Sequence, residues 1–299
     1  MASNSSSVTI RVPGATSNLG PGFDSLGLAL RLYNEITVTR ASGRAIRLIS
    51  PVTEESRLPA TNLLNAAAQA FFRRSGVRPF GCAVAIAGEV PLARGLGSSV
   101  TARLGCAAGL NELSGGPLTR DGLFQLVTQL EGHPDNAAPA IFGGFTAASM
   151  VGREARAIRF PVHRRAKFVT LIPDFEISTP AARKLMPHQY SKADAVHNLT
   201  RVALITAAFA SGSLEALRGC FDDRLHQPYR QQLIPQLTRV IKAGERAGAI
   251  GGWLSGSGST IICLTLEHPD TVGAAMQRVL PNSQIHILSA DTRGFQVLQ

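Results

Sequence analysis

The segment of residues 91–101 constrains the fold of this chain most, because it joins a predicted strand to a predicted helix through a glycine-rich loop. Residues 81–90 are typical of a strand and residues 98–113 of a helix. Glycine permits close backbone approaches that a Cβ atom blocks, and a helix start presents free N–H groups and partial positive charge to an anion. The candidate phosphate-binding residues are Pro91, Leu92, Ala93, Arg94, Gly95, Leu96, Gly97, Ser98, Ser99, Val100 and Thr101.

Two common phosphate-binding motifs are excluded by the same segment. A Walker A loop requires Gly-Lys before a serine or threonine, and no lysine precedes Lys167. A Rossmann fingerprint requires a third glycine, but Ser98, Ser99 and Val100 follow Gly97. The alternative is an ordinary turn between a strand and a helix. The paired serines and the flanking proline and arginine favour phosphate binding over that alternative.

The length of the chain predicts two domains. At 299 residues it exceeds the size at which a single hydrophobic core usually keeps growing. A basic, turn-rich stretch at residues 163–167 separates two halves that each mix helices and strands. We therefore expect one domain at residues 1–163, carrying the glycine loop, and a second at residues 164–299.

Hydrophobic periodicity and turn residues predict the individual elements. Strands are expected at residues 7–12, 35–40, 44–49, 81–90, 144–150, 156–162, 167–172, 250–255, 259–266 and 284–289. Helices are expected at residues 61–74, 98–113, 121–130, 179–186, 193–210, 213–220, 235–247 and 269–280. Thr61 is expected to cap the first of these helices.

Composition restricts the partners and the compartment. Apolar stretches fall short of the roughly 20 residues that span a bilayer, and the small, polar N-terminus lacks the pattern of a secretory signal. A cytoplasmic protein that binds no membrane is expected. The net charge is +10, but aromatic residues make up only 6%, without the basic–aromatic interleaving of nucleic-acid binding, so no nucleic acid is expected as partner. The four cysteines are far apart, which predicts buried thiols rather than a metal site or disulfides.

Four segments together carry a resemblance to the GHMP kinases. Residues 91–99 match the second family motif, Pro-x-x-x-Gly-Leu-Gly-Ser-Ser, and residues 12–24 resemble the first motif as homoserine kinases carry it. Residues 254–260 resemble the third motif, and residues 131–139 are typical of homoserine kinases. The segments follow the family's order and spacing. The departures are small: Ser259 replaces the usual proline of the third motif, and residues 100–101 replace a pair of smaller side chains.

The resemblance implies both a fold and an activity. The implied α+β fold is the two-domain GHMP kinase fold, with an N-terminal domain like domain 2 of ribosomal protein S5, a left-handed crossover, and a ferredoxin-like C-terminal domain. The implied activity is phosphorylation of the L-homoserine hydroxyl by ATP with Mg²⁺, in threonine biosynthesis, and the implied assembly is a homodimer. Another GHMP kinase, acting on mevalonate, a sugar, shikimate or threonine, is the alternative.

The resemblance also implies roles at the nucleotide end of the site. Glu131, with the hydroxyl of Ser99 or second Ser98, would bind Mg²⁺, which prefers oxygen ligands. The alternative for Glu131 is a solvated residue at a helix end, although a carboxylate there opposes the helix dipole, which a bound cation would offset. Asn62 is a candidate for the adenine side or for a helix cap.

At the substrate end, the groups of an amino acid need matching side chains. Asp24, with Asn18 close by, would pair with the ammonium, although both residue types are also common in turns. The resemblance assigns Arg183 and Arg230 to the carboxylate, which an arginine can bind through two hydrogen bonds.

The reacting hydroxyl is expected near His133 and Asn136, which are assigned to catalysis together with Glu131. An amide cannot take up a proton, so either Asp135 acts as the base or no dedicated base exists. Asp135 could instead cap a helix. A rival of another class, a non-catalytic nucleotide- or nucleic-acid-binding protein, is disfavoured by the carboxylate and the loop hydroxyls.

Overall fold

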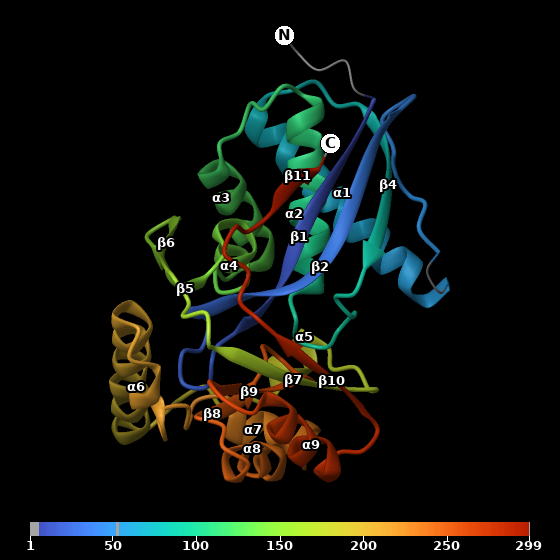
Figure 1. The fold of residues 1–299 in the computed structure, drawn as a ribbon. Helices are drawn as coiled ribbons and strands as arrows, with labels where there is room; N and C mark the ends of the chain where they lie inside the picture. Colours follow the sequence, from blue (N-terminus) through green and yellow to red (C-terminus); the bar gives the residue numbers. More distant parts are fainter. Residues whose placement is uncertain (1–5, 52–53, 299) are drawn as a thin grey trace.

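The chain is built around two β-sheets, which lie one above the other in Figure 1. The computed structural model describes residues 6–51 and 54–298. The strand order of the first sheet is β11-β1-β2-β4-β3, and β5 pairs with both β2 and β6. Its strands are β1 (Ser7–Ser17), β2 (Leu26–Ala41), β3 (Ile46–Leu48), β4 (Gly81–Gly88), β5 (Phe145–Val151), β6 (Glu154–Phe160) and β11 (Gln296–Leu298).

Helices cover one face of the first sheet. They are α1 (Glu54–Ser75), α2 (Ser98–Leu113), α3 (Arg120–Glu131) and α4 (Ala137–Phe142). The central helix, α2, is apolar on nearly every side because it is buried between the sheet and α1 and α3. It lies so close to β2 that a Cβ atom on Gly105 would come within 2.5 Å of Ile36. This packing fixes the position of the α2 N-terminus, where the glycine loop ends.

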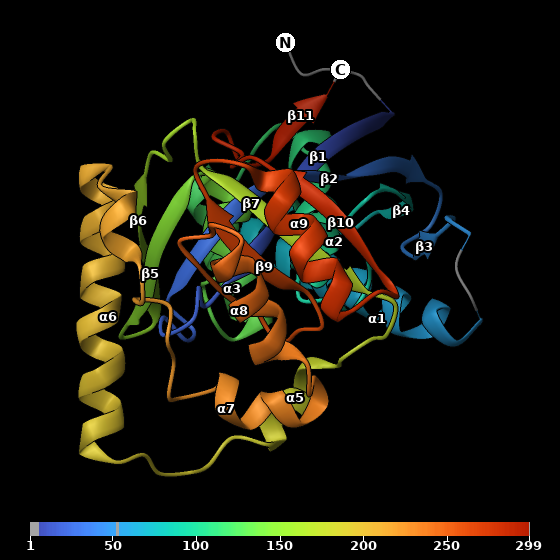
Figure 2. The ribbon, with the colours of Figure 1, turned by 60° about the horizontal axis from the view of Figure 1, so that its bottom comes forward.

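The second sheet has the strand order β10-β7-β9-β8, with every neighbouring pair antiparallel. Its strands are β7 (Lys167–Pro173), β8 (Gly251–Leu254), β9 (Ile261–Thr265) and β10 (Ser283–Leu288). In chain order this is 4-1-3-2, the arrangement of ferredoxin-like domains. Helices α8 (Leu237–Arg246) and α9 (Pro269–Val279) cover one face of it (Figure 2).

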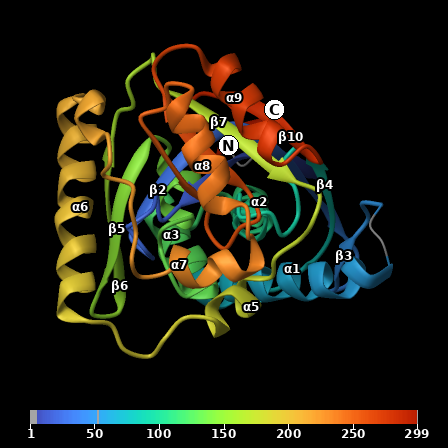
Figure 3. The same cartoon turned by 90° about the horizontal axis from the view of Figure 1, so that it is seen from below.

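The remaining helices lie around the second sheet. They are α5 (Thr179–Lys184), α6 (Lys192–Ser211) and α7 (Gln227–Arg230), with 3₁₀ turns at Leu214–Leu217 and Gln231–Leu233. The long helix α6 stands at the outside of the molecule beside β5 and β6 (Figure 3). Phe209 of α6 stacks on Phe145 of β5 at 4.1 Å between ring centroids. No helix among the described residues is both long and apolar enough to cross a membrane.

One apolar cluster joins the two sheets. Leu28 and Leu30 of β2 belong to the same buried cluster as Phe168 of β7 and Ile262 of β9. The indole Nε1 of Trp253, on β8, donates a hydrogen bond to Thr16 Oγ1 of β1 at 3.0 Å. The two halves are therefore held together by apolar contacts and by this hydrogen bond.

The α+β fold is confirmed, and most predicted elements are present, with local differences. The first helix begins at Glu54 and not at residue 61, so the cap assigned to Thr61 is wrong; its hydroxyl donates to the carbonyl of Arg57. The helix predicted at residues 213–220 is only the 3₁₀ turn Leu214–Leu217. The short elements α4, α7 and β11 were not predicted. The four cysteines are free and buried, as expected.

The domain division at residue 163 stays a prediction. Residue 163 falls between β6, which belongs to the first sheet, and β7, which is the first strand of the second sheet. However, β11 returns to pair with β1 through Thr9, Ile10 and Arg11. The end of the chain therefore belongs to the first sheet.

Candidate active site

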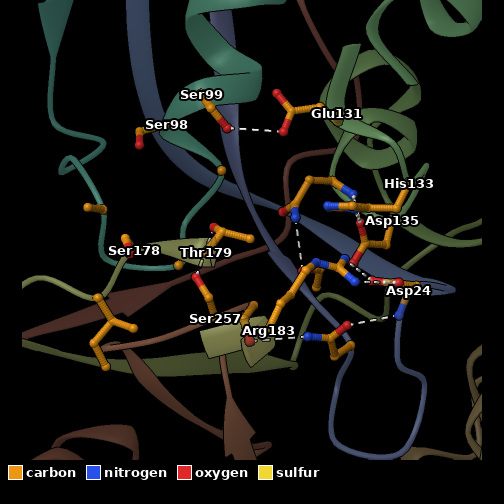
Figure 4. A pocket seen from close by; sticks show the side chains of 18 of the residues that line it. Asp24, Ser98, Ser99, Glu131, His133, Asp135, Ser178, Thr179, Arg183 and Ser257 are labelled. Carbon is orange, nitrogen blue, oxygen red and sulfur yellow. Dashed lines mark hydrogen bonds and ion pairs between the residues drawn. The ribbon is translucent and has the colours of Figure 1, made fainter. Parts of the chain in front are cut away.

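A cleft of about 620 Å³ opens between the two halves of the molecule (Figure 4). Its walls come from the loop after β1, the glycine loop, the ends of α2 and α3, the segment around α5, and the turn between β8 and β9. It brings together most of the residues that the sequence singled out. These are Asn18, Asp24, Ala93, Gly95, Gly97, Ser98, Ser99, Glu131, His133, Asn136, Arg183 and Arg230.

The glycine loop reaches α2 through left-handed backbone conformations. Gly95 and Gly97 have φ angles of 77° and 73°, and Ala93 has φ 50°. Gly97 is the N-cap of α2, and no side chain accepts a hydrogen bond from the helix start there. The first N–H groups of α2 are thus free of a side-chain partner, with Ser98 and Ser99 on the cleft wall. This arrangement can bind an anion.

The turn between β8 and β9 supports the glycine loop from the other sheet. The hydroxyl of Ser255 donates to the carbonyl of Gly95 at 2.7 Å, and the N–H of Thr260 donates to the carbonyl of Arg94 at 3.1 Å. A Cβ atom on Gly95 would lie 2.1 Å from the carbonyl oxygen of Ser255. The β8–β9 turn therefore contacts the glycine loop at Gly95, where an added side chain would collide with the turn.

Several predicted loop residues turn their side chains away from the cleft. Leu96 and Val100 are buried in the apolar clusters, and the hydroxyl of Thr101 donates to the carbonyl of Ser98. The guanidinium of Arg94 donates to the carbonyls of Pro173 and Asp174 and pairs with Glu176 at 3.2 Å. These side chains shape the loop, and Pro91 and Leu92 do not line the cleft either.

Asn62 lies in the interior of α1, is exposed and does not line the cleft. The alternative that it caps a helix is therefore wrong. The adenine contact assigned to it stays a prediction.

Glu131 ends α3 beside the start of α2. Its Oε2 accepts a hydrogen bond from Ser99 Oγ at 3.2 Å, and its Oε1 pairs with Arg103 Nη1 at 2.6 Å. Only 10% of the Glu131 side chain is exposed, so the carboxylate is not a solvated group at a helix end. Sequence reasoning missed Arg103, although it lies four residues after Ser99 and hence on the same side of the helix.

His133 and Asp135 form a hydrogen-bonded pair between the two ends of the cleft. His133 Nδ1 bonds to Asp135 Oδ1, which also accepts the N–H of Asn136 at 2.9 Å. Burial opposes the charged imidazole, but the hydrogen bond and charge of Asp135, together with the charge of Asp24, outweigh it and raise the pKa of His133. The N-cap of α4 is Asn136, so the prediction of Asp135 as a helix cap is wrong.

The raised pKa of His133 predicts a pH dependence of stability. A folded-state pKa above the unfolded value of about 6.5 stabilises the fold fully below that value, and the contribution is lost as the pH rises through the folded pKa. As the pH rises through the folded-state pKa of His133, we expect the urea concentration at the unfolding midpoint to fall for the wild type. The midpoint of His133→Gln should fall less over the same pH range. The matched control is His188→Gln, at an exposed histidine. Identical pH profiles for wild type and His133→Gln would contradict the assignment.

Asn136 lines the cleft next to the glycine loop. Its Nδ2 donates to Ser17 Oγ at 2.9 Å, which fixes the orientation of the amide. Its Oδ1 is buried and has no hydrogen-bond partner among the described residues. A Cβ atom on Gly97 would lie 3.3 Å from this oxygen. The wall of the cleft therefore contains a buried acceptor without a hydrogen-bond partner, adjacent to the glycine loop.

The substrate end of the cleft holds an ion pair. Arg183 donates from Nη2 to Asp24 Oδ1 at 2.7 Å and from Nη1 to Asp24 Oδ2 at 3.1 Å. Asn18 Oδ1 accepts the N–H of Asp24 at 3.0 Å and so fixes the turn that carries the carboxylate. Asn18 and Asp24 therefore stabilise a turn and also line the cleft. A role in the turn and a role in substrate binding are compatible for these two residues.

Arg230 is buried beneath the same end. It donates from Nη1 to the carbonyl of Gly256 at 2.8 Å and lies 5.2 Å from the ring centroid of Phe23. Burial, and then the charge of Arg183, lower the pKa of Arg230 to about 10. It remains a cation at neutral pH, and part of its charge faces the cleft. Phe23, which sequence reasoning missed, also carries Arg183 over its ring at 5.3 Å.

Comparisons with known proteins identify the relatives of this chain. Residues 62–144 match the GHMP kinases N terminal domain, and residues 205–282 match the GHMP kinases C terminal region. The homoserine kinase of Trichormus variabilis is 40% identical over 97% of this chain and 98% of its own length. That of Moorella thermoacetica is 40% identical over 89% of this chain and 90% of its own length.

Solved structures give the same fold. The homoserine kinase of Cytophaga hutchinsonii superposes with a TM-score of 0.91 over 100% of this chain and 99% of its own, at 24% identity. The mevalonate kinase of L. major superposes with a TM-score of 0.72 over 95% of both chains, at 15% identity. The structural likeness establishes the fold, and the sequence identity to the homoserine kinases establishes the relationship. This chain therefore belongs to the GHMP kinase family, among the homoserine kinases.

Proposed function

We propose that this chain transfers the γ-phosphoryl group of ATP to the side-chain hydroxyl of L-homoserine, which yields O-phospho-L-homoserine on the route to threonine. The observation that carries the proposal is the unpaired acceptor Asn136 Oδ1, in the same cleft as the glycine loop and the Asp24–Arg183 ion pair. A nucleotide at the loop and an amino acid at the ion pair would meet at this atom. The sequence identity to homoserine kinases supports the same substrate.

The ion pair suits an amino acid because a zwitterion carries the same two charges. An ammonium next to the Asp24 carboxylate and a carboxylate next to the Arg183 guanidinium would replace one partly exposed ion pair with two charge-assisted contacts. The carboxylates of Asp24 and Asp135 and the imidazole of His133 present ligand atoms within 4.8 Å of one another, so the Asp135 carboxylate adds negative charge near the ammonium. Mevalonate has no ammonium, so the same cleft would leave Asp24 without a partner.

Phosphoryl transfer leaves the protein mainly positioning and charge neutralisation. We propose that Asn136 Oδ1 accepts the hydrogen bond of the substrate hydroxyl and directs its oxygen at the γ-phosphorus. The Asp135 carboxylate is already engaged by His133 and by the N–H of Asn136, so it is not free to take up the proton of the substrate hydroxyl. In a loose transition state the hydroxyl proton can leave late, to an oxygen of the transferred phosphoryl group. No dedicated base is then required.

The oxygen atoms of Ser99 and Glu131 fit the Mg²⁺ that accompanies ATP. A hydroxyl and a carboxylate oxygen lie 3.2 Å apart beside the start of α2, and both are ligand types that Mg²⁺ prefers. When bound, the ion would neutralise charge on the β- and γ-phosphates. We propose Ser99 and Glu131 as its protein ligands, with Ser98 as the alternative hydroxyl.

A substrate panel in a coupled ADP assay tests the function. We expect ADP release with L-homoserine, and far less with mevalonate, shikimate, galactose or L-threonine. Turnover of mevalonate without turnover of homoserine would overturn the substrate assignment and keep the kinase. Binding of RNA, with no ATP turnover on any alcohol, would overturn the kinase itself.

Arg183→Met is expected to raise the KM for homoserine by about 10- to 100-fold, because a charge-assisted contact contributes roughly 1.5–3 kcal/mol. The KM for ATP should change far less, since Arg183 lies at the substrate end. The matched control is Arg224→Met, which removes an exposed arginine paired with Asp194. An equal effect on both KM values would remove Arg183 from the substrate site.

We further propose that the chain forms a homodimer through the outer face of α6. The exposed residues of α6 from position 193 to 210 carry no charge, whereas the exposed residues of α8 include Arg239, Lys242 and Glu245. The uncharged residues are Ala193, Val196, Leu199, Thr200, Ala203, Leu204, Ala207 and Ala210. In an antiparallel pair of identical helices, the larger N-terminal side chains would face the small C-terminal alanines of the partner, and Lys192 would approach Glu215 of the second copy.

Leu199→Glu is expected to convert this dimer into a monomer, because it places a charge in the centre of the apolar face. Leu58→Glu is the matched control, since Leu58 and Leu199 are both 68% exposed on helices. Sedimentation velocity at micromolar protein should give a dimer for the wild type and for Leu58→Glu. A wild-type monomer, or a dimer that survives Leu199→Glu, would contradict the assignment.

A further inference from the structure

Arg103 has a position in the cleft that no motif assigns. It lies on α2, one helical turn after Ser99, and its side chain lines the cleft. Its Nη1 donates to Glu131 Oε1 at 2.6 Å and to the carbonyl of Leu130 at 2.8 Å. Its Nε is buried and has no acceptor among the described residues, and 20% of the side chain is exposed. These hydrogen bonds therefore leave part of the guanidinium of Arg103 without an acceptor.

Arg103 differs from the other cationic side chains of the cleft in its position. Of the lysines and arginines among the described residues, those that line the cleft are Arg103, Arg183 and Arg230. Arg183 and Arg230 flank the ring of Phe23 at the substrate end. Arg94, within the loop itself, is turned toward the carbonyls at the end of β7. Arg103 is thus the cationic side chain at the phosphate end.

The geometry brings the Arg103 guanidinium close to whatever binds at the start of α2. Glu131 accepts from Ser99 on one carboxylate oxygen and from Arg103 on the other, so both donors contact the same carboxylate group. Long side chains on a helix point back toward its N-terminus, and here that direction leads toward Ser99. The planar guanidinium also matches the geometry of phosphate oxygens.

We propose that Arg103 is a nucleotide-binding residue that supplies the positive side chain which the lysine-free glycine loop lacks. In the absence of nucleotide the guanidinium neutralises Glu131. With nucleotide bound, the same guanidinium directs its unused N–H groups at the polyphosphate. This inference rests on the proposed function only in that a nucleotide binds at the start of α2.

The test is nucleotide binding without metal, measured by calorimetry with ATP and EDTA. Arg103→Met should weaken ATP binding by about 10- to 100-fold, as expected for the loss of a charge-assisted contact. Arg103→Lys should recover part of the affinity. Arg120→Met is the matched control, because Arg120 also donates to main-chain carbonyls but does not line the cleft. The KM for homoserine should stay near the wild-type value in all three variants.

A second pair of variants separates phosphate binding from support of Glu131. Arg103→Met leaves the nearly buried Glu131 carboxylate without a cation, which can destabilise the fold. We therefore compare Glu131→Gln with the double variant Glu131→Gln, Arg103→Met, in which no carboxylate remains to be neutralised. A further loss of ATP affinity of about tenfold or more in the double variant supports the proposal. Equal affinities of these two variants would overturn it.

The outcome also distinguishes this inference from the proposed function. A wild type that binds no ATP overturns both. A wild type that binds ATP but phosphorylates a different alcohol overturns the homoserine assignment, and the role of Arg103 is then still decided by its own variants.

Discussion

Asn136→Leu is expected to lower kcat by about 100-fold or more, because small displacements of a reacting group can cost that much. Leucine has a similar size but cannot accept the hydrogen bond of the substrate hydroxyl or donate to Ser17. The substrate would still bind through Asp24 and Arg183, so its KM should change little. The measurement is a coupled ADP assay at saturating ATP and homoserine.

Asn136→Asp provides the control for this prediction. It keeps an acceptor at the same place but adds a negative charge beside the glycine loop, which should weaken ATP binding as well as turnover. Loss of turnover in both variants, with weaker ATP binding only in Asn136→Asp, would fit the account. A kcat of Asn136→Leu close to that of the wild type would show that the Oδ1 atom does not orient the hydroxyl.

Gly95→Ala is expected to remove most of the ATP affinity. The added Cβ would lie 2.1 Å from the carbonyl oxygen of Ser255, so the loop or the β8–β9 turn must move. An amide contact at a partly buried helix start contributes up to about 2 kcal/mol, so the loss of two such contacts weakens binding by up to roughly 1,000-fold. Calorimetry with ADP or a non-hydrolysable ATP analogue measures this effect directly.

Gly116→Ala is the matched control for Gly95→Ala. Gly116 has φ 73°, close to the 77° of Gly95, but nothing lies within 4 Å of its added Cβ. It therefore carries the same left-handed backbone cost, about 1 kcal/mol of stability, without the collision. Its ATP affinity should equal that of the wild type. Equal affinities for both alanine variants would show that the approach of Ser255 to Gly95 does not shape the nucleotide site.

The sequence predicted the parts of the fold that local patterns determine. The helix at residues 98–113 was placed correctly because its apolar residues, the glycine loop before it and the hydroxyls at its start all agree. The start of α1 was placed seven residues late, because Pro59 lies inside the helix and was preceded by polar residues without a clear period. The strand β11 is only three residues long and exists through pairing with β1, so no local pattern could reveal it.

The sequence predicted which residues form the site, but it did not predict the hydrogen bonds and ion pairs between them. Asp24 and Arg183 were each assigned to a group of the substrate, but their mutual ion pair depends on how the two halves pack. Arg94 was expected at the phosphates because it lies in the loop, yet its guanidinium is used by the carbonyls at the end of β7. Arg103 was missed because it follows the motif by one helical turn. Helical geometry alone could have drawn attention to it.

A crystal structure with a non-hydrolysable ATP analogue and L-homoserine tests the central claim most directly. We expect the polyphosphate at the start of α2, hydrogen-bonded to the amides of residues 95–99, with the homoserine hydroxyl about 3–3.5 Å from the γ-phosphorus and bonded to Asn136 Oδ1. A triphosphate bound elsewhere, with the bend between Gly95 and Ser99 empty, would contradict it.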